Sequence, residues 1–417
     1  MRAAAAATGE GTERQPLSFG RILVYSGGSV GAGAFYAFNN FVLPFLLKGL
    51  GAGDLMIGLL SSTRSIEGAI IQPTVGTISD RLWTRLGRRR PFIVVGIPLC
   101  AMFLGIAASS RELVPLAIAI VLFSVFFNAA LDPYTALLPD ISPVRQRGLV
   151  SGVSTGIQLA SQVAFLLLIF FVSAEGVPSW TYLVVAAVLV GGFAITVAGT
   201  PERRDVAELG ERLGLGAYAR ALAEHTQAMR YLGTILVYQF GFSAVLPFLG
   251  LFIEQDIGQT QQTAFILQAV TLLITAVAAV AFGRLADRSG TKRVMLIGWG
   301  LLAVAAVGGT VITTLAQTVA VVLVAGIGNG AATAVKWPLL TTLIPADRAG
   351  VFAGLMAAAD SIAIPLSVVV ATELFLPRVG YRGIFALLAI NMAIAIVLLA
   401  LFVAVPPPRR GSAPASV

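Results

Sequence analysis

The pentapeptide Val-Leu-Pro-Phe-Leu occurs twice in this chain of 417 residues, at Val42–Leu46 and at Val245–Leu249. A loop motif, Gly-x-x-x-Asp-Arg, is also duplicated, at 76–81 and at 283–288. Each copy of the loop motif ends one long apolar run and precedes the next. Recurrence at an offset of 203 or 207 residues, about half of the chain, indicates an internal duplication. The sequence therefore predicts two homologous halves, each a bundle of apolar segments.

The composition points to a membrane protein. Hydrophobic residues make up 57% of the chain and charged residues 12%, whereas soluble domains have roughly 45–50% and about 25%. Apolar runs of about 20 residues, long enough to cross a bilayer, recur twelve times. Helices are expected because irregular backbone facing lipid would leave polar groups unsatisfied, and the alternation of a membrane barrel is absent. The expected spans are 21–47, 55–78, 92–110, 113–138, 149–173, 180–199, 231–253, 261–283, 294–314, 318–343, 351–375 and 382–405.

The basic residues predict the orientation. Of 28 Lys and Arg residues, 22 fall in the two tails and in the loops after even-numbered spans. The residues on the opposite side are Lys48, Arg111, Arg378 and Arg382. The positive-inside rule then places both termini in the cytoplasm, and the net charge of +8 reflects topology rather than nucleic-acid binding.

The expected organisation has five parts. A cytoplasmic tail at 1–20, without the apolar core of a signal peptide, precedes a six-helix bundle at 21–199. A central cytoplasmic loop at 200–230 includes a short helix along the membrane surface, and a second bundle at 231–405 precedes a tail at 406–417. The alanine-rich, arginine-rich composition with compact loops suggests a bacterial inner membrane. We expect a monomer.

The scarcity of Cys and His limits the chemistry. The chain has one cysteine, Cys100, and one histidine, His225. We therefore expect no metal centre, no cofactor and no Ser–His or Cys–His catalytic pair, and no phosphate-binding glycine loop is present. The sequence does not predict an enzyme.

The loop after the second span resembles the signature loop of the major facilitator superfamily, in which Gly-x-x-x-Asp-Arg is followed by a basic cluster, here Gly87–Arg90. Residues 79–93 resemble the corresponding loop of sucrose–proton symporters. Residues 128–140 resemble the end of span 4 in the glycoside–pentoside–hexuronide cation symporters. This resemblance implies an all-α membrane protein with twelve transmembrane helices in two pseudo-symmetric six-helix bundles, which transports a small molecule by alternating access.

One departure bears on the coupling ion. Sodium-coupled members of the glycoside group have paired acidic residues on span 2, whereas this chain has Arg64 and Glu67 there. Protons are therefore favoured over sodium. Asp132 stands one residue later than the usual acid of the family's span 4, so the family role is not transferred to it.

The duplicated loop motif predicts a cytoplasmic gate. Asp80 and Asp287 are placed to pair with an Arg and with a neighbouring helix N-terminus across the junction of the halves, which would hold the cytoplasmic side closed while the outside is open. The alternative is that the arginines only fix topology. The predicted gate residues are Gly76, Asp80, Arg81, Arg88, Arg89, Gly283, Asp287, Arg288 and Arg293.

Charges within spans are costly and therefore face a cavity or a partner. We expect proton coupling to involve Glu67, Asp132, Lys336 and Asp360. Lys336 and Asp360 lie on consecutive spans at similar depth, so they can form a pair that acts as a proton switch. The alternatives are snorkelling of Lys336 to the interface and a structural pair of Arg64 with Glu67.

Uncharged polar residues within the spans suggest a cavity for a polar, neutral solute. Polar residues precede the shared proline on spans 1 and 7, and interrupted segments at matching places point to a binding site. Ser154, Gln158, Ser161 and Gln162 form a polar stripe on span 5. The predicted substrate-binding residues are Asn39, Asn40, Arg64, Asn128, Gln158, Gln162, Tyr238, Gln239, Asn329 and Trp337. Interhelical hydrogen bonding is the alternative for any one of them.

Three functions remain open from the sequence. The first is a proton-coupled symporter of a small glycoside such as sucrose or maltose. The second is a proton-coupled exporter of drugs or lipophilic metabolites, against which the charges on span 2 and the glutamines on span 5 argue. The third is a major-facilitator-like protein of pigment delivery or assembly, which would need no coupling carboxylates.

Overall fold

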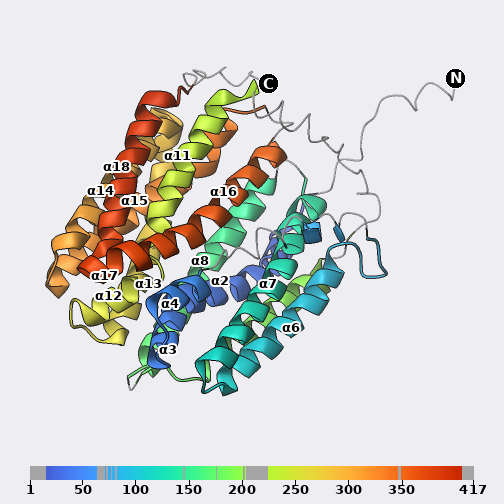
Figure 1. Cartoon of the computed structure of the whole chain (residues 1–417). Helices are drawn as coiled ribbons and strands as arrows, with labels where there is room; N and C mark the ends of the chain where they lie inside the picture. The colour runs from blue at the N-terminus through green and yellow to red at the C-terminus, as the bar shows by residue number, and fades with distance from the viewer. Residues whose placement is uncertain are drawn as a thin grey trace.

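The computed structural model describes residues 16–62, 71, 74–76, 78–79, 82–143, 146–174, 176–200, 202, 224–345 and 349–405. Within these ranges the regular structure is helical (Figure 1). Ten helical segments of the described chain are long and apolar enough to span a membrane. The predicted all-α membrane architecture is therefore confirmed, and Arg64, Glu67, Asp80 and Arg81 lie outside the described residues.

The helices of the first half begin with one long, subdivided span. It runs from Phe19 to Gly49 and is apolar enough to span a membrane. Its parts are α1 (Phe19–Tyr25), α2 (Gly27–Ala37), the π-helix η1 (Phe38–Val42) and α3 (Leu43–Gly49). The half continues with α4 (Asp54–Leu60), α6 (Arg90–Ser109), α7 (Leu113–Ile141), α8 (Arg147–Val172) and α9 (Thr181–Gly199).

The second half follows the same plan. Its helices are α11 (Thr226–Ser243), α12 (Leu249–Gln255), α13 (Gln261–Ser289), α14 (Thr291–Val311), α15 (Leu315–Thr341), α16 (Ala349–Val370), the π-helix η5 (Ala371–Phe375), α17 (Leu376–Val379) and α18 (Arg382–Phe402). The seventh predicted span, 231–253, is wrong at its start and in its continuity. Its helix begins at Thr226 and is interrupted at 244–248 before α12.

Both copies of the repeated pentapeptide lie where a helix is irregular. In the first copy, η1 precedes α3, which carries Pro44 in its first turn. In the second copy, Pro247 lies in the turn between α11 and α12. Proline removes a backbone donor and clashes with the preceding turn, so an interruption at each copy is expected.

The two halves contact each other through several pairs of helices. Within the first half α2 packs on α8 and α9, and within the second half α13 and α14 pack on α15. Between the halves α8 packs on α13, α3 on α12 and α4 on α16. Figure 1 shows α3, α4 and α12 together at the end away from the C-terminus of the chain. By the predicted orientation this is the extracellular end.

Candidate functional site

Lys336 and Asp360 form an ion pair between α15 and α16. The Nζ of Lys336 lies 3.2 Å from both carboxylate oxygens of Asp360, and the two side chains are 23% and 14% exposed. The Tyr231 hydroxyl donates to the backbone oxygen of Lys336 at 2.7 Å, which ties α11 to the same turn of α15. The pairing predicted from the sequence is present, and it joins three helices of the second half around one charge pair.

Asp132 lies against the loop motif of the second span. A Cβ built on Gly76 would be 3.3 Å from Oδ2 of Asp132, so the Asp132 carboxylate lies close to the backbone of Gly76. Two predicted residues, one from the coupling set and one from the gate, are thus adjacent. The fourth coupling candidate, Glu67, lies outside the described residues.

Four predicted substrate-binding amides bond to protein groups of their own half. Their acceptors come from the same helix or from a neighbouring helix or helix end of that half. The bonds are Asn39 to Ser61 O at 2.8 Å, Asn128 to Ser124 O at 2.9 Å, Gln239 to Ser243 Oγ at 2.9 Å and Asn329 to Thr275 Oγ1 at 3.5 Å. These four bonds are structural hydrogen bonds, which were the alternative to a role in substrate binding.

The polar stripe on α8 divides into two kinds of residue. Ser154 Oγ lies 2.8 Å from Ser26 Oγ, and Ser161 donates to Val30 O at 2.7 Å, so both serines hold α8 to the first span. The half-buried Gln158 and the buried Gln162 have no such bond to another described residue in this structure. The two glutamines therefore remain free to bind a solute.

The predicted aromatic residues do not converge on one place. Tyr238 is buried and stacks on Trp299, with ring centroids 5.3 Å apart. Trp337 is 38% exposed. Asn40 is half-buried, next to the buried Asn39. The structure thus places the predicted set at several points along the spans rather than in one pocket.

The arginines of the first loop bond within their own half. Arg88 makes a two-point ion pair with Asp140 at the end of α7, with distances of 2.7 and 3.2 Å, and Arg89 lies 3.3 Å from the same carboxylate. Arg89 also donates to Ser79 Oγ at 2.6 Å. The carboxylate that holds both arginines was not among the predicted gate residues. Its position at the cytoplasmic end of a span, beside a basic loop, was the available signal.

Glu202 caps the N-terminus of α6. Its carboxylate accepts hydrogen bonds from the backbone N–H groups of Arg88, Arg89 and Arg90 at 2.8 to 3.1 Å. A negative charge at this position is favoured by the unpaired N–H groups and by the helix dipole. This residue, just after α9, was also missed from the sequence.

The second copy of the gate motif is open to solvent. Asp287, Arg288 and Arg293 are exposed, and within the described ranges none of them forms an ion pair. The predicted gate contact across the halves is therefore absent from the described part of the second copy. Asp80 and Arg81 of the first copy lie outside the described residues. Because the gate is expected to close only when the outside is open, this arrangement fits a closed extracellular end.

A polar cluster closes the end of the molecule that the predicted orientation makes extracellular. The Tyr381 hydroxyl, in the second half, donates to Oδ1 of Asp54 at 2.8 Å, and Lys48 Nζ lies 3.1 Å from the same oxygen and 3.3 Å from the hydroxyl. Burial, followed by the hydrogen bond to Asp54, raises the pKa of Tyr381 well above its ordinary value, so the hydroxyl remains a donor. Sequence reasoning missed this cluster.

Aromatic contacts support the same closure. Phe45 packs edge-on against Phe265 of α13, with ring centroids 5.2 Å apart, and its ring covers Gly250. Phe248 lies against Gly58 of α4. Each half therefore inserts one phenylalanine of its pentapeptide into the other half.

The fold thus has two similar halves, an interruption in the first and in the seventh span, and one closed end. The profile of the family described as MFS/sugar transport protein matches residues 24–407. The chain belongs to this family. Membership of this family describes a membrane transport protein with a multi-pass fold.

Individual relatives are distant. The sucrose transport protein SUT1 of Oryza sativa subsp. japonica is 30% identical over 100 residues, which cover 24% of this chain and 18% of that protein. The multi-drug resistance efflux pump PmrA homolog of Lactococcus lactis subsp. lactis (strain IL1403) is 24% identical over 286 residues, covering 64% of this chain and 67% of the relative. The chain thus aligns to less than a fifth of the length of the sucrose transporter.

The fold agrees with a solved structure. A point mutant of the nucleoside transporter NupG superposes with a TM-score of 0.75 over 92% of this chain and 99% of NupG, at 13% identity. At this identity the likeness establishes the fold alone. The major facilitator fold predicted from the sequence is confirmed.

Proposed function

We propose that this protein is a proton-coupled symporter of a small glycoside such as sucrose or maltose. The observation that carries the proposal is the Lys336–Asp360 ion pair, at 3.2 Å between two spans of the second half. A charge pair within spans is costly to maintain, and in transporters such residues mark coupling sites. The family description and the similarity to a sucrose transporter support a sugar as the substrate.

The coupling follows from the chemistry of the pair. A proton on the Asp360 carboxylate removes the charge that holds Lys336, so the ammonium is released from its partner. The Tyr231 hydroxyl bonds to the backbone of Lys336 and so links this change to α11, which is the first part of the interrupted seventh span. Proton uptake at Asp360 would thereby shift α11. Because α12 continues the same span, the shift would reach the closed extracellular end.

Sugar recognition would use the amides that the protein leaves free. Gln158 and Gln162 lie four residues apart on α8, and Asn40 lies in η1. Amides donate and accept hydrogen bonds and therefore match sugar hydroxyls. We place the two six-helix bundles at 21–199 and 231–405 of a bacterial inner-membrane monomer with cytoplasmic termini, in agreement with the positive-inside rule.

The test is uptake of radiolabelled sucrose and maltose into proteoliposomes with and without an inward proton gradient. We expect accumulation that needs the gradient and is lost in Asp360→Asn. The matched control is Glu373→Gln, because Glu373 is an exposed carboxylate on the same span. Absence of uptake with either a proton or a sodium gradient would overturn the proposal.

Export of lipophilic compounds is the second candidate. The observation that favours it is the similarity to an efflux pump homolog, which is 24% identical over 286 residues. In the same proteoliposomes, a proton gradient that drives movement of ethidium but not of either sugar would select export.

A further inference from the structure

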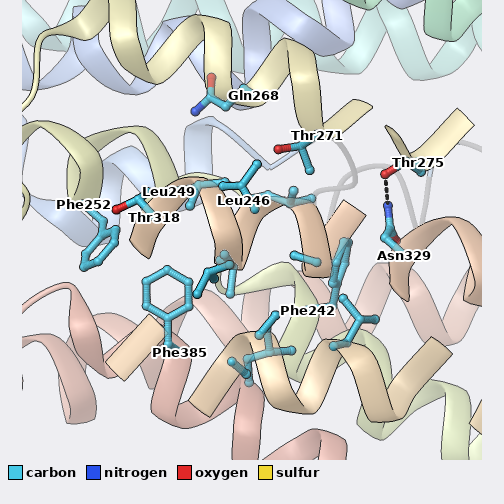
Figure 2. A pocket seen from close by; sticks show the side chains of 18 of the residues that line it. Phe242, Leu246, Leu249, Phe252, Gln268, Thr271, Thr275, Thr318, Asn329 and Phe385 are labelled. Atoms are coloured by element: carbon cyan, nitrogen blue, oxygen red, sulfur yellow. Dashed lines mark hydrogen bonds between the residues drawn. The ribbon is translucent and has the colours of Figure 1, made fainter. Parts of the chain in front are cut away.

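A cavity of about 110 Å³ lies mainly within the second half. Its walls come from α11, α12, α13, α14, α15 and α18, and most of its lining is apolar, including Phe242, Leu246, Phe252 and Phe385 (Figure 2). The Lys336–Asp360 pair does not line it, and none of the free amides of the first half reaches it. The cavity is therefore separate from the site proposed for the solute.

One polar side chain in this cavity has unmet hydrogen-bonding capacity. Gln268 is 1% exposed, and neither its amide oxygen nor its amide nitrogen has a hydrogen-bond partner among the described residues. The other polar groups shown in Figure 2 are bonded: Thr271 donates to Leu267 O, Thr318 to Thr314 O, and Asn329 to Thr275. A buried amide without hydrogen-bond partners costs free energy. A polar group that enters the cavity and bonds to Gln268 would remove this cost.

We propose that this cavity binds a small, mainly apolar molecule that carries one hydroxyl or amide group, which bonds to Gln268. A cavity of about 150 Å³ lined by apolar side chains holds benzene, so a cavity of about 110 Å³ admits at most a molecule of about that size. Sugars are excluded, because the lining provides few polar groups and the volume is too small for a disaccharide. Phenol has this chemistry and is at the upper limit of this size.

Occupancy of the cavity is tied to the closed extracellular end. Phe41 of η1, in the first half, forms part of the wall. If the extracellular end opens during transport, Phe41 withdraws with its half and the cavity loses that wall. A bound molecule therefore stabilises the closed extracellular end. This consequence rests on the alternating access of the proposed function, whereas the binding site itself does not.

Binding is tested by titrating phenol and benzene into the full-length protein in lipid nanodiscs, with saturation-transfer NMR as the readout. We expect phenol to bind the wild type more tightly than benzene. Gln268→Leu should weaken phenol binding by about tenfold and leave benzene binding intact, since one buried hydrogen bond is lost. Ala306→Leu, which fills the cavity from α14, should abolish binding of both probes. Equal signals from the wild type and Ala306→Leu would overturn the site.

Closure is tested with spin labels at Leu50→Cys and Val379→Cys, two exposed positions at the extracellular end of opposite halves. The native Cys100 is buried and stays unlabelled. Phenol should narrow the distance distribution toward its short component, and Ala306→Leu should remove this response. Binding without a change in distance would overturn the coupling to closure. Neither readout uses a sugar or a proton gradient, so the result is independent of the uptake test.

Discussion

The ring of Phe45 packs edge-on against the ring of Phe265, with centroids 5.2 Å apart and planes at 77°. Phe45 belongs to the first pentapeptide, and Phe248 is its counterpart in the second. Phe248 lies against Gly58, which is 207 residues before Phe265, the same offset as that of the loop motifs. The duplication thus produces a reciprocal contact in which each half inserts a phenylalanine into equivalent positions of the other.

Gly58→Ala should oppose closure of the extracellular end. A Cβ at this position would clash with Val368 and would lie 2.8 Å from the Phe248 ring, both in the second half. Overpacking of this kind costs about 1–3 kcal/mol, and here it applies only while the halves are in contact. Spin labels at Leu50 and Val379 should report a longer mean distance.

The control for that substitution is Gly53→Ala, because no heavy atom lies within 4 Å of a Cβ built there. Its φ of −71° suits an alanine. Equal distance distributions in the two variants would contradict the reciprocal contact as a closing element.

Tyr381→Phe should weaken the same closure through the polar cluster. The substitution removes the donor that binds Asp54 at 2.8 Å across the halves and leaves the Lys48–Asp54 pair in place. Loss of one such bond is worth about 1 kcal/mol, or about a fivefold change in the ratio of closed to open forms. Tyr182→Phe is the matched control, since the Tyr182 hydroxyl is buried without a partner in the described part of the chain. A similar shift from both variants would argue against the cluster.

Hydropathy and proline placement predicted most of the fold. The apolar runs located the spans, and the duplicated proline located the two interruptions, because both signals act locally along the chain. The start of α11 was predicted five residues too late. Its first turn is polar, and a helix can continue into polar sequence because the bonds of its backbone do not depend on hydropathy.

Contacts between segments that are distant in the sequence could be predicted only in part. The Lys336–Asp360 pair was predicted because consecutive antiparallel spans place residues of similar depth side by side. The Lys48–Tyr381 contact joins residues 333 positions apart, and no local signal specifies the packing that brings them together. Asp140 and Glu202 were missed for the same reason, since a basic loop can find its acidic partner on any neighbouring helix end.

Glu202→Gln should destabilise the fold rather than alter coupling. The carboxylate accepts hydrogen bonds from three consecutive backbone N–H groups at the start of α6, and an amide there loses the charge that strengthens them. We expect a loss of about 1–2 kcal/mol, seen as a lower midpoint of thermal unfolding in detergent. Glu112→Gln is the control, because Glu112 stands at the start of α7 without a capping hydrogen bond from its side chain. An unchanged midpoint for Glu202→Gln would show that the cap contributes little.

Single and double substitutions at the Lys336–Asp360 pair should distinguish a contribution to stability from a role in proton coupling. Asp360→Leu and Lys336→Met should each lower the thermal midpoint, because one charge is left among the spans without its partner. Since the two side chains are 23% and 14% exposed, we expect each single variant to lose about 1–3 kcal/mol of unfolding free energy. The loss would be larger for a fully buried pair.

The double variant Lys336→Met/Asp360→Leu should recover the stability of the wild type, since apolar residues of similar size replace a buried pair at little cost. It should not recover accumulation of sugar against its gradient, because the proposed proton acceptor, the Asp360 carboxylate, is gone. Counterflow exchange of labelled sugar, which needs no proton, should persist in the double variant and shows that it is folded and able to move substrate. Gradient-driven accumulation by the stable double variant would assign the pair a structural role and transfer the coupling to another carboxylate, with Asp132 beside Gly76 the first to be tested.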